Sequence, residues 1–232
     1  MGPSKKALAI GRAIDQLKRR PLVRRMKLLA SARINLVLDV GASHGQFGAQ
    51  MRALGYAGRM VSFEPLAKSY ASLERKMKRD RAWTGMRVAL GARKQRTRIN
   101  VSGDPRASSL LDMLPAHRRV ASYFDVVDTE EIDVVTLDEI TPGLIGNHDR
   151  VYLKIDAQGF EQQVLRGARR TLAGVTGVQL EMSLVPLYRG ETLLPQMVTW
   201  MTRRGFTLRS LEYGFCDPRS GAMLQVDGIF YR

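Results

Sequence analysis

The chain has 232 residues, of which 44% are hydrophobic and 25% charged, and its formal net charge at pH 7 is +15. These values suit one globular α/β domain with a short appendage. No apolar run reaches the roughly 18 residues needed to cross a bilayer, and the N-terminus lacks the apolar core of a secretory signal. The single cysteine, Cys216, excludes an internal disulfide and predicts a cytoplasmic location.

Much of the positive charge lies in residues 5–33, which hold ten lysines and arginines and one acid, Asp15. Apolar residues at helical spacing on both sides of Pro21 predict two short amphipathic helices that break at this proline. We expect residues 1–33 to form a basic appendage whose helices pack on a domain of residues 34–232. The alternative is an arm that contacts an anionic membrane surface or an acidic substrate, since basic amphipathic helices bind such surfaces.

A strand, a glycine turn and a helix are predicted next. Leu36–Val40 belongs to a short apolar run without alternation of polar and apolar residues. This is expected for a strand buried on both faces of a parallel sheet. Gly41 and Gly45 let the backbone turn sharply and approach a ligand, and a helix begins near Gln46. This arrangement binds nucleotides at the carboxyl end of a strand. The spacing Asp39-x-Gly-x-x-x-Gly is that of S-adenosylmethionine (SAM) methyltransferases rather than of dinucleotide enzymes.

The second predicted strand, Arg59–Phe63, ends in an acid, Glu64, which is followed by Pro65. A carboxylate at this place can accept hydrogen bonds from both ribose hydroxyls of an adenosine. The alternative is a solvated charge at a strand end. We favour ribose binding, because the glycine turn precedes Glu64 at the appropriate distance.

Residues 67–137 are predicted to add a helix, a third strand and a ribbon. The helix covers Ala67–Lys78 and the third strand Met86–Gly91. Alternation in Thr97–Val101 and the β-branched run Ile132–Leu137 predict two paired strands.

The intervening segment Gly103–Glu130 is polar and proline-interrupted, and it is long for a connection in a compact domain. Loops of this length are often functional. We therefore expect this loop, which contains Ser109, to cover a cofactor or select an acceptor. His117 adjoins two arginines and is expected in a surface cluster.

The strand Val151–Asp156 carries a lysine, Lys154, in its middle. An unpaired buried ammonium costs several kcal/mol, so we expect an acidic partner. The single acid of the neighbouring strand Val178–Met182, Glu181, can supply it, either in a purely structural pair or within a site. Lys154 and Asp156 share a face, and Asp156 ends the strand.

The rest of the chain is predicted to close the sheet. A helix through residues 160–172 begins with Glu161 in its first turn. In the loop that contains Tyr188 and Arg189, these two residues either line an acceptor pocket or belong to an ordinary loop with a packed tyrosine. A last helix over 193–201 and two antiparallel strands, 206–213 and 224–231, follow.

Several blocks resemble the ordered motifs of FkbM-type methyltransferases. They are Asp39–Phe47, Phe63–Pro65, Ser108–Leu110, Thr136–Asp138, Lys154–Glu161 and Leu165–Ala168. The Lys-Ile-Asp-x-x-Gly-x-Glu block is the most specific, and Ser43 stands where the family commonly has asparagine. The resemblance, which extends from about Ile34 to the C-terminus, implies SAM-dependent methylation, usually of a hydroxyl on a sugar or a secondary metabolite. It also implies a Rossmann-like class I methyltransferase fold: a seven-stranded, mostly parallel sheet with helices on both faces and an antiparallel C-terminal strand.

The cofactor-binding residues expected from the motifs and the resemblance lie at the first strands, the third strand and the long loop. They are Asp39, Gly41, Ala42, Ser43, Gly45, Phe63, Glu64, Pro65, Ala89, Leu90, Ser109 and Asp156. Asp156 is the first candidate for the base that accepts, or the group that orients, an acceptor hydroxyl. His44 is the second candidate for this base, and the alternative is that it only caps the helix. Lys154 and Glu181 complete the set of candidate catalytic residues. A site for a divalent metal on Asp156 and Glu181 has little support, because the sequence offers no third ligand beside these two acids.

The expected acceptor is a small molecule or a glycolipid. The net charge of +15 leaves RNA methylation as an alternative. Against it, the chain lacks the Asn/Asp-Pro-Pro-aromatic segment of base N-methylating enzymes and a Pro-Cys nucleophile. A non-catalytic module that binds SAM or docks on membranes is the third alternative.

Overall fold

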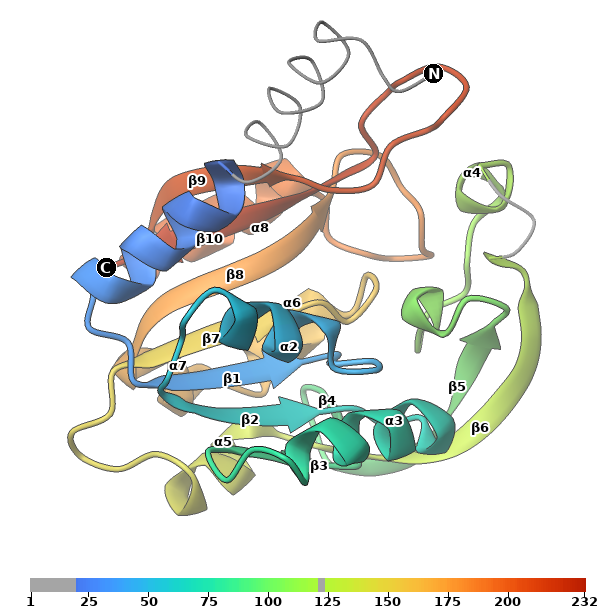
Figure 1. Ribbon diagram of the computed structural model, residues 1–232. Helices are drawn as coiled ribbons and strands as arrows, with labels where there is room; N and C mark the ends of the chain where they lie inside the picture. Colours follow the sequence, from blue (N-terminus) through green and yellow to red (C-terminus); the bar gives the residue numbers. More distant parts are fainter. Residues whose placement is uncertain (1–19, 121–123) are drawn as a thin grey trace, which may run out of the picture.

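The computed structural model describes residues 20–120 and 124–232 (Figure 1). A seven-stranded sheet forms their centre. Its strands in spatial order are β3 (Trp83–Met86), β2 (Arg59–Phe63), β1 (Leu36–Val40), β7 (Val151–Ile155), β8 (Val175–Ser183), β10 (Gln225–Tyr231) and β9 (Thr207–Tyr213). Neighbouring strands are parallel, except that β10 runs antiparallel to β8 and to β9. The predicted sheet with its closing antiparallel hairpin is confirmed.

The two central strands, β1 and β7, are buried along their whole length, as their apolar sequences predict. Side chains alternate along a strand, so β1 contributes to two cores. Leu36 and Leu38 belong to the core on one face, and Val37 to the core on the other. Asp39 and Lys154 lie on the Val37 face. The polar residues of the central strands are therefore placed between the sheet and the helices of that face.

Helices cover both faces of the sheet (Figure 1). The Val37 face is covered by the helix over 20–31, α2 (Gln46–Ala53) and α3 (Ala67–Met77), and the opposite face by α5 (Leu137–Ile140), α6 (Glu161–Arg166), α7 (Arg169–Gly174) and α8 (Leu194–Thr202). The second predicted N-terminal helix is thus confirmed, and its Leu29 is buried. The first predicted N-terminal helix lies outside the described residues. The predicted break at Pro21 lies at their start, next to residues outside the described part. The domain boundary after residue 33 stays a prediction.

Within the described ranges, no helix is both long and apolar enough to cross a membrane. The single helix predicted for 160–172 is wrong, because α6 ends at Arg166 and α7 starts at Arg169. Gly167 lies between them, and a Cβ atom there would be 1.9 Å from the carbonyl oxygen of Gly91. The chain changes direction where this close backbone contact requires glycine.

A second, three-stranded sheet has the order β4 (Ala89–Leu90), β6 (Val126–Val135) and β5 (Gln95–Ser102). The predicted ribbon is the antiparallel pair β5–β6. The third strand predicted for Met86–Gly91 is wrong, because Met86 ends β3 in the large sheet whereas Ala89 pairs with Val134 in the small one. The long loop between β5 and β6 contains two short helical turns, η1 (Pro105–Ala107) and α4 (Pro115–Arg118).

Candidate active site

A cavity of about 550 Å³ opens at the carboxyl ends of β1, β2 and β7 and continues beside β8 and β10. Its volume is in the range of sites for small ligands. The predicted site residues that line it are Gly41, Ala42, Ser43, Phe63, Glu64, Pro65, Ala89, Leu90, Ser109, Lys154, Asp156 and Glu181. Asp39, His44 and Gly45 are not among the lining residues. The structure therefore brings most of the predicted set into one place.

The glycine turn joins β1 to α2 in a conformation that few side chains tolerate. Gly41 has a φ of +72°, and a Cβ atom on it would lie 1.8 Å from the carbonyl oxygen of Asp156. Gly45, at φ +78°, precedes α2 and faces Leu73 and Trp83 at close range. The ends of β1 and β7 consequently approach each other more closely than any residue with a side chain would allow.

Glu64 joins the end of β2 to this turn. Its carboxylate accepts hydrogen bonds from the backbone N–H groups of Ser43, at 2.8 Å, and of Leu66, at 3.0 Å. The side chain is buried, so the alternative of a solvated charge is wrong, and burial raises the pKa of Glu64 to about 7. Each oxygen keeps a lone pair for a further donor. The residue can thus accept ribose hydroxyls, and the site fits an adenosyl group.

The raised pKa of Glu64 predicts how cofactor binding depends on pH. An ionised carboxylate accepts two hydroxyl donors better than a protonated one, so affinity for S-adenosylhomocysteine should fall as the pH drops through about 7, by about tenfold in total. Glu64→Gln removes the charge and should weaken binding by about tenfold while abolishing this pH dependence. Isothermal titration from about pH 8 to about pH 6 measures both quantities. Parallel pH curves for the two proteins would contradict the assignment.

Lys154 is buried between two carboxylates of neighbouring strands. Its Nζ lies 3.3 Å from Asp39 Oδ1 and 3.3 Å from Asp156 Oδ2, and it donates to the carbonyl oxygen of Gly41 at 3.2 Å. Burial alone lowers the pKa of Lys154, but Asp156 and Asp39 outweigh it and raise that pKa above its ordinary value. The prediction that Glu181 pairs with Lys154 is therefore wrong. Lys154 stands opposite Asp39 in the β1–β7 register and opposite Gln179 in the β7–β8 register.

Glu181 is instead linked to Asp156 through a single amide. Gln158 Nε2 donates to Asp156 Oδ1 and to Glu181 Oε2, both at 2.7 Å, and Gln225 Nε2 donates to the same Glu181 oxygen at 2.9 Å. Burial raises the pKa of Glu181 well above its ordinary range, and Asp156 adds to the effect. Tyr188 donates its hydroxyl hydrogen to Gln158 Oε1 at 2.8 Å. The two carboxyl groups are thus held in one network.

The sequence did not single out Gln158, although it lies inside the most specific motif block. Its φ of +53° marks a turn between Asp156 and Gly159. Glu161 secures this turn by accepting hydrogen bonds from the N–H groups of Ala157 and Gly159, at 2.8 and 3.2 Å. A polar residue between the acid that ends a strand and a turn glycine is the signal that could have identified it.

The loop after β8 packs against this network. Tyr188 is buried, and it is not among the lining residues of the cavity. Arg189 is not among the lining residues of the cavity either, and it pairs with Asp112 at 3.4 Å, with both side chains largely exposed. This is therefore an ordinary loop with a packed tyrosine, and its only link to the network described above is the hydrogen bond from Tyr188 to Gln158.

The cavity also has a polar wall and an aromatic wall that the sequence did not reveal. The polar wall consists of Arg25, Gln50, Gln179, Gln225 and Asp227, and the aromatic wall of His117, Phe124 and Phe215. These residues are widely separated along the chain, so no single motif contains them. Burial raises the pKa of Asp227 to about 6.

His117 was expected at the surface, and this prediction is wrong. The imidazole is 2% exposed and packs against Phe124 and Phe215, with ring centroids at 4.8 and 5.4 Å. Burial lowers the pKa of His117 to about 4, so the ring is neutral at pH 7. Hydrophobic packing of a short helix against the hairpin overrides the polarity of the neighbouring arginines.

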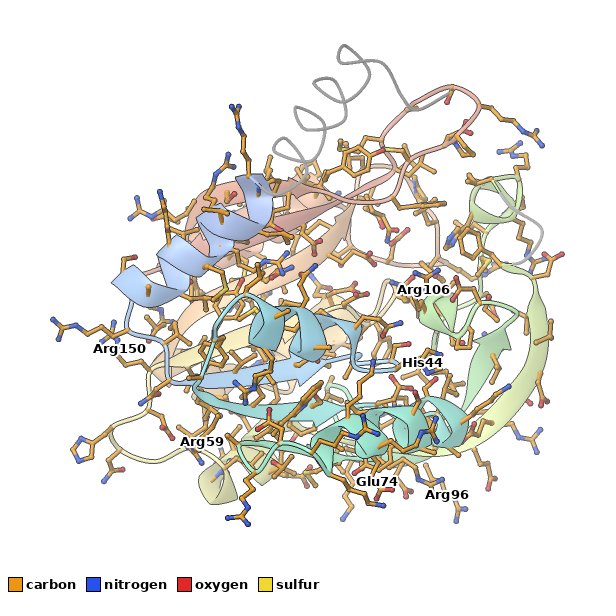
Figure 2. The ribbon with its side chains drawn as sticks, viewed as in Figure 1. His44, Arg59, Glu74, Arg96, Arg106 and Arg150 are labelled. Atoms are coloured by element: carbon orange, nitrogen blue, oxygen red, sulfur yellow. The ribbon has the colours of Figure 1, made fainter. Side chains whose placement is uncertain are left out.

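His44 lies on the turn after β1, at the same end of the molecule as Arg106 of η1 (Figure 2). Its carbonyl oxygen accepts a hydrogen bond from Lys76 Nζ at 2.6 Å, and its imidazole is not part of the cavity wall. Across residues 20–120 and 124–232, no group of three or more His, Cys, Asp or Glu side chains could hold a metal ion.

The strand order, the glycine turn after β1 and the acid after β2 define the Rossmann-like fold of class I SAM-dependent methyltransferases. Magnesium protoporphyrin IX methyltransferase (ChlM) from Synechocystis PCC 6803, solved with bound SAM, is similar with a TM-score of 0.50 and 11% identity, over 100% of this chain and 86% of that one. The family model of the methyltransferase FkbM domain matches residues 39–208. The chain therefore belongs to the FkbM methyltransferase family. The predicted fold and cofactor, SAM, are confirmed.

Two further solved structures are similar to the chain. One is an rRNA methylase from Streptococcus thermophilus, with a TM-score of 0.49 and 9% identity over 92% of this chain and 97% of that one. The other is an uncharacterized protein from Listeria monocytogenes serotype 4b, with a TM-score of 0.47 and 10% identity over 89% of this chain and 66% of that one. A search of curated proteins finds no match.

Proposed function

We propose that the protein transfers the methyl group of SAM to a hydroxyl of a sugar, a glycolipid or a secondary metabolite. The observation that carries this proposal is the single cavity in which the glycine turn and Glu64 meet Asp156 at the end of β7.

The half of the cavity next to β1 and β2 is the proposed cofactor site. Glu64 accepts the ribose hydroxyls, and Gly41 and Ser43 present the turn to the remainder of the cofactor. Asp39 acts through its ion pair with Lys154, and Gly45 starts α2. The lining residues that complete this half are Ala42, Phe63, Pro65, Ala89, Leu90 and Ser109.

The half next to β7 and β8 is the proposed acceptor site. SAM supplies an activated methyl group when bound, so the protein needs to orient the acceptor oxygen, exclude water and remove a proton. We assign to Asp156 the orientation of the hydroxyl and the acceptance of its proton. Lys154 holds Asp156 in an ion pair, while Gln158, which donates to both Asp156 and Glu181, fixes the orientation of the Asp156 carboxylate. His44 receives no step, since it does not line the cavity.

Asp156→Asn keeps the size of the side chain and removes the base, and it should lower methyl transfer by about 10²- to 10⁴-fold. Binding of S-adenosylhomocysteine should change little, because Glu64 and the glycine turn are untouched. A labelled-methyl assay over a panel of hydroxyl compounds, together with calorimetry, measures both effects. Asp133→Asn, an exposed position on β6, is the matched control. Full activity of Asp156→Asn would contradict the assigned role, and absence of transfer and of SAM binding in the natural protein would overturn the proposed function.

RNA methylation is the second candidate, supported by the net charge of +15. The acceptor half contains three carboxyl groups, those of Asp156, Glu181 and Asp227, which disfavour a polyanionic acceptor. A steep loss of acceptor affinity with salt would favour RNA, and a flat response the small molecule. A non-catalytic module is the third candidate; it predicts that Asp156→Asn keeps full biological activity.

The surroundings of the enzyme are also part of the proposal. We place it in the cytoplasm because of its single cysteine, and the ten basic residues and single acid of residues 5–33 support contact with an anionic membrane surface as the alternative to plain packing on the domain.

A further inference from the structure

Four acids form one row across four adjacent strands, β7, β8, β10 and β9 (Figure 1). Glu181 on β8 stands directly opposite Asp227 on β10, and Asp227 stands opposite Glu212 on β9. Asp156 follows the last residue of β7, whose partner on β8 directly precedes Glu181, so it continues the row. Side chains that stand opposite one another lie on the same face of a sheet, and like charges there destabilise it. The acid row therefore needs compensating positive charge.

Positive charge contacts only the two ends of the acid row. At one end Asp156 pairs with Lys154, and at the other end Glu212 pairs with Arg25. Lys154 is also shared with the buried carboxylate of Asp39, so a single cation serves two acids there. The two middle acids have no ion pair among the described residues. Their charges are therefore left for another group to compensate.

The two middle acids, Glu181 and Asp227, both line the cavity. The Glu181 carboxylate accepts hydrogen bonds from the side-chain amides of Gln158 and Gln225, which carry no charge. Burial raises the pKa of both carboxyl groups, and the neighbouring Asp156 adds to the effect. The side chains of the described part include no set of three ligands for a metal ion. The cation that fits between the two acids is thus an organic one.

A second feature of the same cavity points to a ligand independently of the acids. His117 lines the cavity and is 2% exposed, and its Nδ1 atom has no hydrogen-bond partner among the described residues. Its ring packs on that of Tyr188, at 5.1 Å, and the Tyr188 hydroxyl donates to Gln158 of the acid network. Buried polar atoms normally have a partner, so we expect an occupant of the cavity to supply it. Phe124 and Phe215 complete this aromatic wall, and aromatic faces attract ammonium groups.

We infer that the acceptor carries a protonated amine, which binds between Glu181 and Asp227 beside the aromatic wall. The inference rests on the proposed function and narrows the substrate class of the same site. An ammonium group supplies the missing charge and donates up to three hydrogen bonds to carboxylate and imidazole acceptors. Neighbouring strands lie about 4.8 Å apart, so the amine would lie roughly 5–10 Å from a hydroxyl held at Asp156. An amino sugar, or an amino alcohol of similar length, fits this separation.

The positive charge of the cofactor has a different place. In the proposed function the adenosyl group lies at Glu64 and the methyl group faces Asp156, so the sulfonium lies beside the ends of β1 and β7. Asp39 and Asp156 share their one cation, Lys154, at these strands. Asp227 is two strands further along the sheet, at about 10 Å. The acids of β8 and β10 therefore remain for the acceptor.

Calorimetry on the protein saturated with S-adenosylhomocysteine tests the inference. The probes are glucosamine, galactosamine and mannosamine, each compared with glucose, galactose or mannose, which has a hydroxyl in place of the amine. At least one amine should bind more tightly than its neutral hexose by about tenfold or more. The variant Glu181→Gln/Asp227→Asn should weaken binding of that amine by about tenfold or more and leave the hexose almost unaffected. Glu131→Gln/Asp133→Asn is the matched control, because it makes the same two changes at exposed positions on β6.

Two results would overturn the inference. The first is that none of the three amines binds more tightly than its hexose, a comparison that needs no variant. The second is that a folded Glu181→Gln/Asp227→Asn protein binds the amine as tightly as the natural protein. Calorimetry with S-adenosylhomocysteine alone separates these outcomes from a failure of the proposed function. A protein that binds this nucleoside without preferring an amine contradicts only the inference, whereas a protein that does not bind it contradicts the proposed function.

Discussion

Replacing Gly41 by alanine is expected to lower the affinity for S-adenosylhomocysteine by at least about 100-fold. The residue has a φ of +72°, which costs a residue with a side chain roughly 1–2 kcal/mol. The added methyl group would also lie 1.8 Å from the carbonyl oxygen of Asp156, so the ends of β1 and β7 must separate. These two strand ends carry the turn and Asp156, and a displacement of about 1 Å is enough to spoil such a site.

Gly55→Ala is the control for this experiment. Gly55 also has a positive φ, +92°, but nothing lies within 4 Å of the position of its Cβ atom. The control should lose about 1 kcal/mol of stability and retain cofactor affinity. Calorimetry measures the affinity and chemical denaturation the stability of both variants. Equal affinities for the two variants would show that the close approach of β1 and β7 is not needed for cofactor binding.

Lys154→Met is expected to lower the free energy of unfolding by about 3–5 kcal/mol. Methionine fills the space of the lysine stem, but it leaves the Asp39 carboxylate, which is 1% exposed, without its cation. A buried charge without a partner is the costly state, whereas an apolar pair can be neutral. The double variant Lys154→Met/Asp39→Asn should therefore recover most of the lost stability.

Urea denaturation measures these changes, and Lys78→Met provides the comparison. Lys78 pairs with Glu74 at 3.0 Å on the surface of α3, and its side chain is 70% exposed. Removal of an exposed pair one helical turn apart should cost only about 0.5 kcal/mol. A loss of similar size in Lys154→Met, or no recovery in the double variant, would show that the buried ion pair does not stabilise the sheet.

The proposed cofactor half of the cavity could be predicted because its parts are local in sequence. A strand, its turn and the following helix position Gly41 and Ser43, and the next strand end places Glu64 beside them. Parallel neighbouring strands bring these segments to one edge whatever the rest of the chain does. The hairpin and the ribbon followed from periodicity for the same reason, and the fold class followed from the resemblance to the family.

The partner of Lys154 could not be predicted, because register decides it. Sequence requires an acid near a buried lysine, and both Asp39 and Glu181 satisfy that requirement on strands adjacent to β7. The β1–β7 register places Asp39 directly opposite Lys154, while Gln179 occupies that position on β8. A pairing register depends on packing and turn geometry across the whole sheet.

The sequence by itself determined the strand–turn–helix at the cavity, the acid that follows the second strand and the family of the chain. Only the tertiary structure decided which other residues line the cavity. Arg25, His117 and Asp227 come from a helix, a loop and the penultimate strand in space, and they meet at one cavity through long-range packing. Local patterns report which face of an element is buried, but they do not report which distant element covers it.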